Sequence, residues 1–133
     1  MKRLLIPILL LIGWLAAAAS ATHHHDTDSR GVYKVIAQAP ANARDWKNPY
    51  EGQPDAILAG EKLYHQHCAE CHGDDARGAH RSADLRSAGV QNATPGELVW
   101  LLRNGNLAGG MPSWSGLPEQ RRWQIVSYLR TLR

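Results

Sequence analysis

The sequence predicts an all-α domain with three main helices joined by long loops. In three stretches of this 133-residue chain, apolar residues recur three and four positions apart, which is the period of a helix, and no stretch alternates over the length of a strand. Prolines and glycines interrupt the chain between these stretches. A chain of this length can form one small hydrophobic core but not two.

The first helix is expected over residues 55–67. Asp55, which follows Pro54, is the expected cap. Gly60 lies inside this helix, where it costs about 1 kcal/mol relative to alanine, and it predicts that another helix crosses closely there. The expected apolar stripe consists of Ile57, Leu58, Tyr64 and Cys68.

The second helix begins at a predicted capping box. Thr94 is the cap, Pro95 suits the first turn, and Glu97 can reach back to the backbone of Thr94. Asn104-Gly105 ends the helix. Trp100 belongs either to the hydrophobic core or to the cover of a cofactor edge, and these two roles are compatible. The buried stripe is expected to consist of Leu98, Leu101 and Leu102.

The third helix opens at Leu117-Pro118 and runs close to the C-terminus. Arg121-Arg122 is expected to form a solvated helix face rather than a docking patch. Tyr128 lies near the border of two adjoining apolar rows, which consist of Trp123 with Val126 and of Ile125, Leu129 and Leu132.

Residues 1–21 are predicted to be a signal peptide. Lys2 and Arg3 precede the uncharged apolar run Leu4–Ala19, and the Ala-Ser-Ala triplet ending at Ala21 is a small-x-small cleavage pattern. Cleavage after this triplet and export to the periplasm are therefore expected. The alternative is an uncleaved anchor, because the apolar run has about the minimum length for a membrane span. Only then would the chain contact a membrane.

Residues 22–54 are predicted to be a partly disordered N-terminal extension, followed by the main domain over residues 55–133. The histidine run at 23–25 is expected to be a solvated tail. A short extended segment is expected over Gly31–Ala37, and prolines rule out long regular structure beyond it. Large aromatic residues are seldom exposed, so two of them are expected to pin the extension to the main domain, namely Trp46 and Tyr50.

The basic composition does not indicate a nucleic-acid partner. The formal net charge falls by two, from +3 to +1, when Lys2 and Arg3 leave with the signal peptide. No cluster of basic residues interleaved with aromatics occurs in the sequence. We therefore expect no binding to nucleic acid.

The strongest chemical signal is Cys68-Ala69-Glu70-Cys71-His72. This is the C-x-x-C-H pattern of covalent haem attachment, and the chain has only these two cysteines. Two intervening residues let one helical turn present both thiols to the vinyl groups of haem, and His72 then lies beneath the iron as proximal ligand. The other interpretations are a redox dithiol, half of a zinc site, or coincidence. No βαβ pattern and no second cysteine pair supports the first two.

Met111 is the only methionine besides the initiator. It lies between Gly109-Gly110 and Pro112, an unusual setting for a residue that merely fills the core. Glycines let the backbone approach a flat cofactor, and a thioether is a soft iron ligand. Met111 is therefore the expected distal ligand, with core packing as the alternative.

Other histidines offer weaker alternatives. His80 could ligate iron, but a histidine in a soluble loop is commonplace. His65 and His67 lie on the first helix and are expected to face solvent.

Taken together, these features resemble a class I cytochrome c, over roughly Asp55 to Leu132. In that family a glycine, an aromatic residue and the first haem cysteine follow one another at intervals of four, matched here by Gly60, Tyr64 and Cys68. The closing helix matches at Ile125 and Tyr128-Leu129. The loop between the second and third helices is similar to that of small periplasmic cytochromes and of haem modules serving oxidases or quinoprotein dehydrogenases, through Asn104-Gly105, Gly110-Met111-Pro112 and Trp114.

The resemblance implies a cytochrome c fold around one covalently bound haem. It implies that Cys68 and Cys71 attach the haem c, that His72 and Met111 are the proximal and distal iron ligands, and that the first and last helices cross near Gly60.

The chain departs from the family at one point. Family members often have a proline after the motif, and a neighbouring carbonyl accepts the proximal imidazole N–H. The stretch from Arg77 to Leu85 contains no proline. A backbone carbonyl around Gly78 to Arg81 is expected to serve instead.

The predicted function is that of a one-electron carrier in a periplasmic respiratory or dehydrogenase-linked chain, not an enzyme. Histidine–methionine ligation fills both axial positions, so no small-molecule substrate is expected. The expected partners are redox proteins, namely a dehydrogenase, an oxidase or a reductase. Two alternatives remain: a tightly bound electron-transfer subunit of a larger oxidoreductase, and a haem peroxidase, which would need an open distal site.

Overall fold

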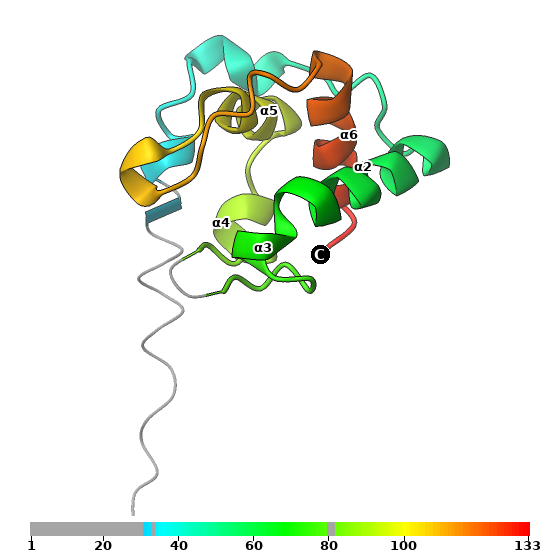
Figure 1. The fold of residues 1–133 in the computed structure, drawn as a ribbon. Coiled ribbons are helices and arrows are strands. Elements are labelled where there is room, and N and C mark those ends of the chain that lie inside the picture. Colours follow the sequence, from blue (N-terminus) through cyan, green and yellow to red (C-terminus); the bar gives the residue numbers. More distant parts are fainter. Residues whose placement is uncertain (1–30, 33, 80–81) are drawn as a thin grey trace, which may run out of the picture.

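The structure is a computed structural model that describes residues 31–32, 34–79 and 82–133. These residues form helices and loops without a strand, which confirms the predicted all-α fold (Figure 1). The expected signal peptide, the histidine run and His80 lie outside the described residues. The three longest helices are α2 (Pro54–His67), α5 (Pro95–Asn104) and α6 (Glu119–Leu129). Shorter elements are the 3-10 turns η1 (Ala41–Asp45) and η2 (Leu107–Gly109) and the single-turn helices α3 (Ala69–His72) and α4 (Ala88–Gln91).

Helices α2 and α6 pack directly against each other at Gly60, as the sequence predicts (Figure 1). A Cβ atom on Gly60 would lie 2.0 Å from the carbonyl oxygen of Gln124, so no side chain fits at this crossing. One turn further along, the rings of Tyr64 and Tyr128 meet with centroids 5.3 Å apart. The helix-weakening glycine thus allows close contact between the first and last long helices.

The buried face of α2 differs from the predicted stripe. Leu58 is 55% exposed, whereas Leu63, which the stripe omitted, is buried. The buried face of α2 follows Ala56, Gly60 and Tyr64, and Leu58 lies away from it. The predicted cap is also wrong: the helix begins at Pro54, no side chain caps it, and Asp55 lies in its first turn.

The predicted capping box at the start of α5 is confirmed. The Thr94 hydroxyl accepts a hydrogen bond from the Glu97 amide at 3.2 Å, and the Glu97 carboxylate accepts one from the Thr94 amide at 2.8 Å. The same carboxylate pairs with the Arg44 guanidinium at 2.9 Å. Burial would raise the pKa of Glu97, but the hydrogen bonds from Thr94 and Arg44 outweigh it and hold that pKa below its usual value.

Residues before α2 pack on the main domain. A Cβ on Gly96 would lie 1.8 Å from the carbonyl oxygen of Ala43, so η1 sits tightly on the start of α5. The Asn48 amide donates to the Ser127 hydroxyl at 2.9 Å and to the Trp123 carbonyl of α6 at 3.2 Å. Two aromatics pack against the core as predicted, Trp46 and Tyr50.

The expected extended segment over Gly31–Ala37 is helical instead. Residues 31–32 and 34–36 have helical backbone. Val32, Val35 and Ile36 are spaced three and four apart, so a helix places them on one face, and Ile36 is buried. The β-branched residues of this segment favour an extended backbone, but their spacing of three and four is that of a helix, and the helix is what forms.

Within residues 31–32, 34–79 and 82–133, no helix combines the length and hydrophobicity that crossing a membrane requires.

Candidate functional site

The structure brings all four predicted site residues together on one cavity. Cys68, Cys71, His72 and Met111 line a cavity of about 440 Å³, a size typical of cofactor sites. Its wall is otherwise mainly aliphatic, with residues from α4, α5, α6, the loop before α4 and the N-terminal helical segment. These include Val32, Val35, Leu85, Val90, Leu98, Leu101, Leu102, Ile125 and Leu129.

The cysteine motif forms a single helical turn. Helix α2 ends at His67, and α3 resumes directly after Cys68, whose carbonyl accepts the amides of Cys71 at 3.2 Å and His72 at 2.9 Å. Neither cysteine forms a disulfide; Cys68 is half-buried and Cys71 is exposed. Burial, followed by the neighbouring sulfur of Cys71, raises the pKa of Cys68 to about 11. One turn therefore presents both thiols and the imidazole along the edge of the cavity.

His72 is oriented by a backbone carbonyl. Its Nδ1 lies 2.9 Å from the carbonyl oxygen of Ala83. Because a carbonyl can only accept, Nδ1 carries the proton of the neutral ring, so in that tautomer the lone pair that can bind a metal lies on Nε2.

The predicted carbonyl, around Gly78 to Arg81, is wrong. The amide of Gly78 donates to the His72 carbonyl at 2.8 Å, and the amide of Ala79 donates to the Cys71 carbonyl at 3.0 Å. These bonds turn this part of the loop onto the backbone of the motif. The carbonyl that accepts from His72 Nδ1 comes later in the loop, at Ala83.

A tight glycine-rich loop places Met111 on the cavity wall. Asn106 and Met111 exchange two backbone hydrogen bonds of 2.9 Å, closing the loop around η2. Gly110 has a positive φ of 85° and Gly105 one of 71°. A Cβ on Gly105 would lie 2.6 Å from the Pro112 carbonyl, so this position requires glycine for space as well as conformation.

The loop that follows Met111 is held by a buried arginine. Arg122 is 8% exposed, and its Nη1 donates to the carbonyls of Trp114 at 3.3 Å, of Ser115 at 3.2 Å and of Leu117. The expectation that Arg121-Arg122 forms a solvated face is therefore wrong for Arg122, whereas Arg121 is exposed. Loop carbonyls have no helical partners, and one guanidinium can satisfy several of them.

Two cavity residues went unrecognised in the sequence. His67 is half-buried, lines the cavity and lies with its ring centroid 5.2 Å from that of Trp114, so the expectation that it faces solvent is wrong. His65 is exposed, as expected. Among the described residues, Trp114 lines the cavity and Trp100 does not. The helical position of His67, directly before Cys68, was the signal that could have revealed it.

These residues fit a haem group covalently attached through two thioether bonds. Two thiols, one imidazole lone pair and one thioether surround walls that are mostly apolar, which suits a flat, largely apolar macrocycle. Among the described residues, no group of three or more His, Cys, Asp or Glu side chains could hold a bare metal ion, so a zinc site finds no support there.

An all-α fold that carries a C-x-x-C-H turn on an apolar cavity defines a class I c-type cytochrome. Residues 55–129 match the model of the family described as cytochrome c oxidase, cbb3-type, subunit III, and the chain belongs to this family. The cofactor is accordingly haem c, covalently bound and containing iron, and the protein is an electron-transfer protein rather than an enzyme.

Curated relatives agree with this assignment. The chain is 26% identical to cytochrome c550 of Pseudomonas aeruginosa, over 93% of this chain and 91% of that protein. It is 29% identical to the cbb3-type cytochrome c oxidase subunit CcoP of Rubrivivax gelatinosus, over 85% of this chain and 38% of the subunit. It is 33% identical to the CcoP subunit of Rhodobacter capsulatus, over 61% of this chain and 32% of the subunit. The chain thus spans only about a third of these two subunits. No solved structure matches the chain significantly.

Proposed function

We propose that this chain is a one-electron carrier whose haem is attached through Cys68 and Cys71, with the iron bound between His72 and Met111. The observation that carries the proposal is the convergence of these four side chains on one apolar cavity. The Ala83 carbonyl supports it independently, because it leaves the Nε2 lone pair of His72 available for a metal.

Each of these residues has a distinct role. The haem iron, when bound, supplies one-electron chemistry by alternating between ferrous and ferric states. The carbonyl of Ala83 fixes the ring plane of His72 and raises its basicity. Met111 offers a soft sulfur, which favours the ferrous state and so raises the potential relative to two histidines. Aliphatic walls keep water away, so little rearrangement is required when an electron is exchanged.

We further propose that the carrier works in the bacterial periplasm. The proposed organisation is a signal peptide over residues 1–21, an extension over 22–54 and a haem domain over 55–133. The basic start, apolar run and Ala-Ser-Ala triplet support export. The contacts of η1 and Asn48 with α5 and α6 support a role for the extension in bracing the haem domain.

The proposed partners are redox proteins, namely a dehydrogenase, an oxidase or a reductase. Cys71 is exposed, so an electron has a short path at that edge of the cavity, where a small interface would suffice. The identity to CcoP subunits favours a second candidate, a tightly bound subunit of a larger oxidoreductase. Purification from native membranes and periplasm distinguishes them: a free carrier is recovered alone, whereas a subunit is recovered with its complex at fixed stoichiometry.

The ligand assignment is tested with Met111→Ala. The variant should retain its haem, lose the weak far-red sulfur-to-iron absorption band, and shift the reduction equilibrium toward the ferric form by at least about tenfold, which corresponds to about 59 mV for one electron. Leu107→Ala is the matched control, because Leu107 belongs to the same loop and its side chain is exposed. An unchanged spectrum and potential in Met111→Ala would exclude Met111 as the ligand.

The attachment is tested by mass and extraction. The mature protein should carry the mass of one haem and keep its colour in acid–acetone. The double change Cys68→Ala with Cys71→Ala should abolish both properties. A colourless mature chain with the mass of the polypeptide alone would exclude the proposal.

A further inference from the structure

The carbonyl that orients His72 belongs to a loop without a proline. Ala83 lies between α3 and α4, and the sequence from Arg77 to Leu85 contains no residue with a fixed φ. A peptide group in such a loop can rotate and move its oxygen away from Nδ1. Something else in the structure must hold Ala83 at 2.9 Å from His72.

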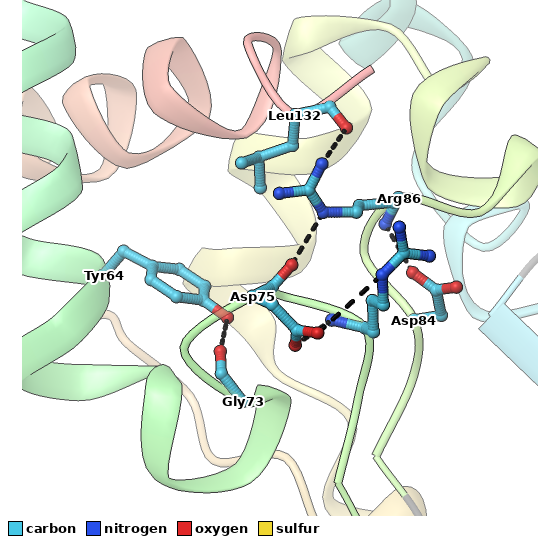
Figure 2. A network of polar contacts seen from close by, with 7 residues as sticks. Tyr64, Gly73, Asp75, Asp84, Arg86 and Leu132 are labelled. Carbon is cyan, nitrogen blue, oxygen red and sulfur yellow. Dashed lines mark hydrogen bonds and ion pairs between the residues drawn. The ribbon is translucent and has the colours of Figure 1, made fainter.

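Backbone contacts hold only part of this loop. The amide of Leu85 donates to the carbonyl of Ala76 at 2.8 Å, which joins the returning limb to the outgoing limb. Gly78, with φ of 85°, lets the limbs come close, because a Cβ there would lie 2.4 Å from the Ser82 carbonyl oxygen. On the motif side, the Tyr64 hydroxyl donates to the carbonyl of Gly73 at 2.6 Å (Figure 2).

Arg86 joins the remaining parts of the loop (Figure 2). Its amide donates to the buried Asp84 carboxylate at 2.8 Å, which fixes the turn directly after Ala83. Its Nε donates to the carbonyl of Asp75 in the outgoing limb at 2.6 Å. Its Nη1 donates to the carbonyl of Leu132, beyond α6, at 3.2 Å. One side chain thus connects both limbs of the loop to the C-terminal segment.

We propose that Arg86 is a positioning residue for the haem site: its guanidinium holds the loop so that the carbonyl of Ala83 stays on the imidazole N–H of His72. The proposal rests on the proposed ligation of iron by His72. The planar fork of an arginine suits this task, because Nε and Nη1 reach two carbonyls in fixed directions. A lysine has one ammonium and cannot span both with the same geometry.

The proposal predicts the direction of the change at the iron. A weaker bond from Nδ1 to Ala83 makes the imidazole of His72 a weaker donor, and a weaker donor stabilises ferric iron less. The reduction equilibrium then shifts toward the ferrous form. Loss of a nearby positive charge alone would shift it toward the ferric form, so the sign separates positioning from simple electrostatics.

The experiment compares Arg86→Gln with Arg77→Gln in the mature haem protein. Arg77 lies in the same loop, and its guanidinium pairs with the carboxylate of Asp75 at 3.7 Å, but its side chain is 63% exposed. In the diamagnetic ferrous state, solvent exchange of the His72 Nδ1–H is measured by NMR together with the reduction potential. Arg86→Gln should accelerate exchange about tenfold and favour the ferrous form by several-fold, whereas Arg77→Gln should change exchange by less than about twofold.

Equal exchange rates in Arg86→Gln and Arg77→Gln would overturn the proposal. Should Arg86→Gln fail to retain haem, Arg86→Lys decides: faster exchange supports the role of the guanidinium, and exchange at the parent rate overturns it. Failure of the proposed ligation is recognised separately. In that case the His72 ring protons of the parent protein would lack the large shift caused by a porphyrin directly above them.

Discussion

Two loops position His72 and Met111 at the cavity, one by orienting the imidazole and the other by carrying the sulfur, and they are built differently. The Ala83 loop (residues 73–87) contains the buried residues Ala76 and Asp84 and is cross-linked by the side chain of Arg86. The Met111 loop (residues 105–118) is largely exposed around η2. It depends on glycines with positive φ, on the two backbone hydrogen bonds between Asn106 and Met111, and on the hydrogen bonds that Arg122 of α6 donates to its carbonyls.

The difference concerns how each loop can fail. In the Ala83 loop, several hydrogen bonds from different segments converge, so the imidazole stays oriented unless the limbs separate. In the Met111 loop, the bonds donated by Arg122 reach only carbonyls beyond Met111, so the position of the sulfur follows the backbone between Gly105 and Pro112. The loop buries little of its own surface. We therefore expect the thioether side of the site to open more readily than the imidazole side.

Gly78→Ala should have the largest effect and should act on the Ala83 loop alone. The new Cβ meets the Ser82 carbonyl at 2.4 Å in a left-handed conformation, so the free energy of unfolding should fall by about 3 kcal/mol. Exchange of the His72 Nδ1–H should accelerate while the far-red sulfur band persists. Gly52→Ala, with φ of 72° and open surroundings, is the control and should cost only about 1 kcal/mol.

Gly105→Ala should produce the converse pattern, with a loss of about 2–3 kcal/mol in the free energy of unfolding. The added Cβ would lie 2.6 Å from the Pro112 carbonyl and should displace Met111, so the far-red band should weaken while His72 exchange stays slow. Gly110 also has a positive φ, but a Cβ there would meet no atom within 4 Å, so the far-red band should persist in Gly110→Ala. Equal spectra for Gly105→Ala and Gly110→Ala would contradict the assignment of the clash.

Arg122→Gln should weaken the Met111 loop by about 2 kcal/mol, because three carbonyls lose a charged donor. Thermal unfolding and the intensity of the far-red band measure the effect. Its neighbour Arg121 is exposed, so Arg121→Gln should stay within about 0.5 kcal/mol of the parent. Similar losses for the two arginines would show that the buried clamp contributes little.

Glu97→Gln should have the smallest effect and should alter neither loop selectively. The folded-state pKa of Glu97 is lowered, so its contribution is present above the unfolded pKa of about 4.3 and is lost as the pH falls through the folded value. Near pH 7 the variant should be less stable by about 1 kcal/mol, with both spectroscopic signals unchanged. The difference in melting temperature between variant and parent should shrink below about pH 4; a difference independent of pH would refute the carboxylate's role.

The fold was predictable where the signal is local or periodic. The capping box at Thr94 and the crossing at Gly60 follow from spacing and from the cost of a glycine in a helix. The meeting of the motif with Met111 followed from chemistry, because a lone pair of cysteines followed by histidine and a single internal methionine are typical haem-binding groups. The sequence therefore predicted which side chains meet in the cavity.

The loops were predicted less well, because their contacts depend on where backbone carbonyls lie. No periodic pattern in the sequence indicates that Ala83, rather than a residue of Gly78–Arg81, accepts the bond from His72. None indicates that Arg122 is buried. In the sequence, an arginine that binds loop carbonyls looks the same as an arginine on a solvated helix face. Only the folded path of the chain separates these two cases.

The crossing at Gly60 also constrains the order of assembly. The crossing joins segments near the two ends of the family-matched region, so its contacts span a long stretch of sequence. It can form only after α6 has been synthesised and has come into contact with α2. Until then, α2 lacks the partner that buries Tyr64 and holds the following turn. Closure of the helix pair is therefore a late step, and it fixes the turn that carries Cys68 and Cys71 on the cavity.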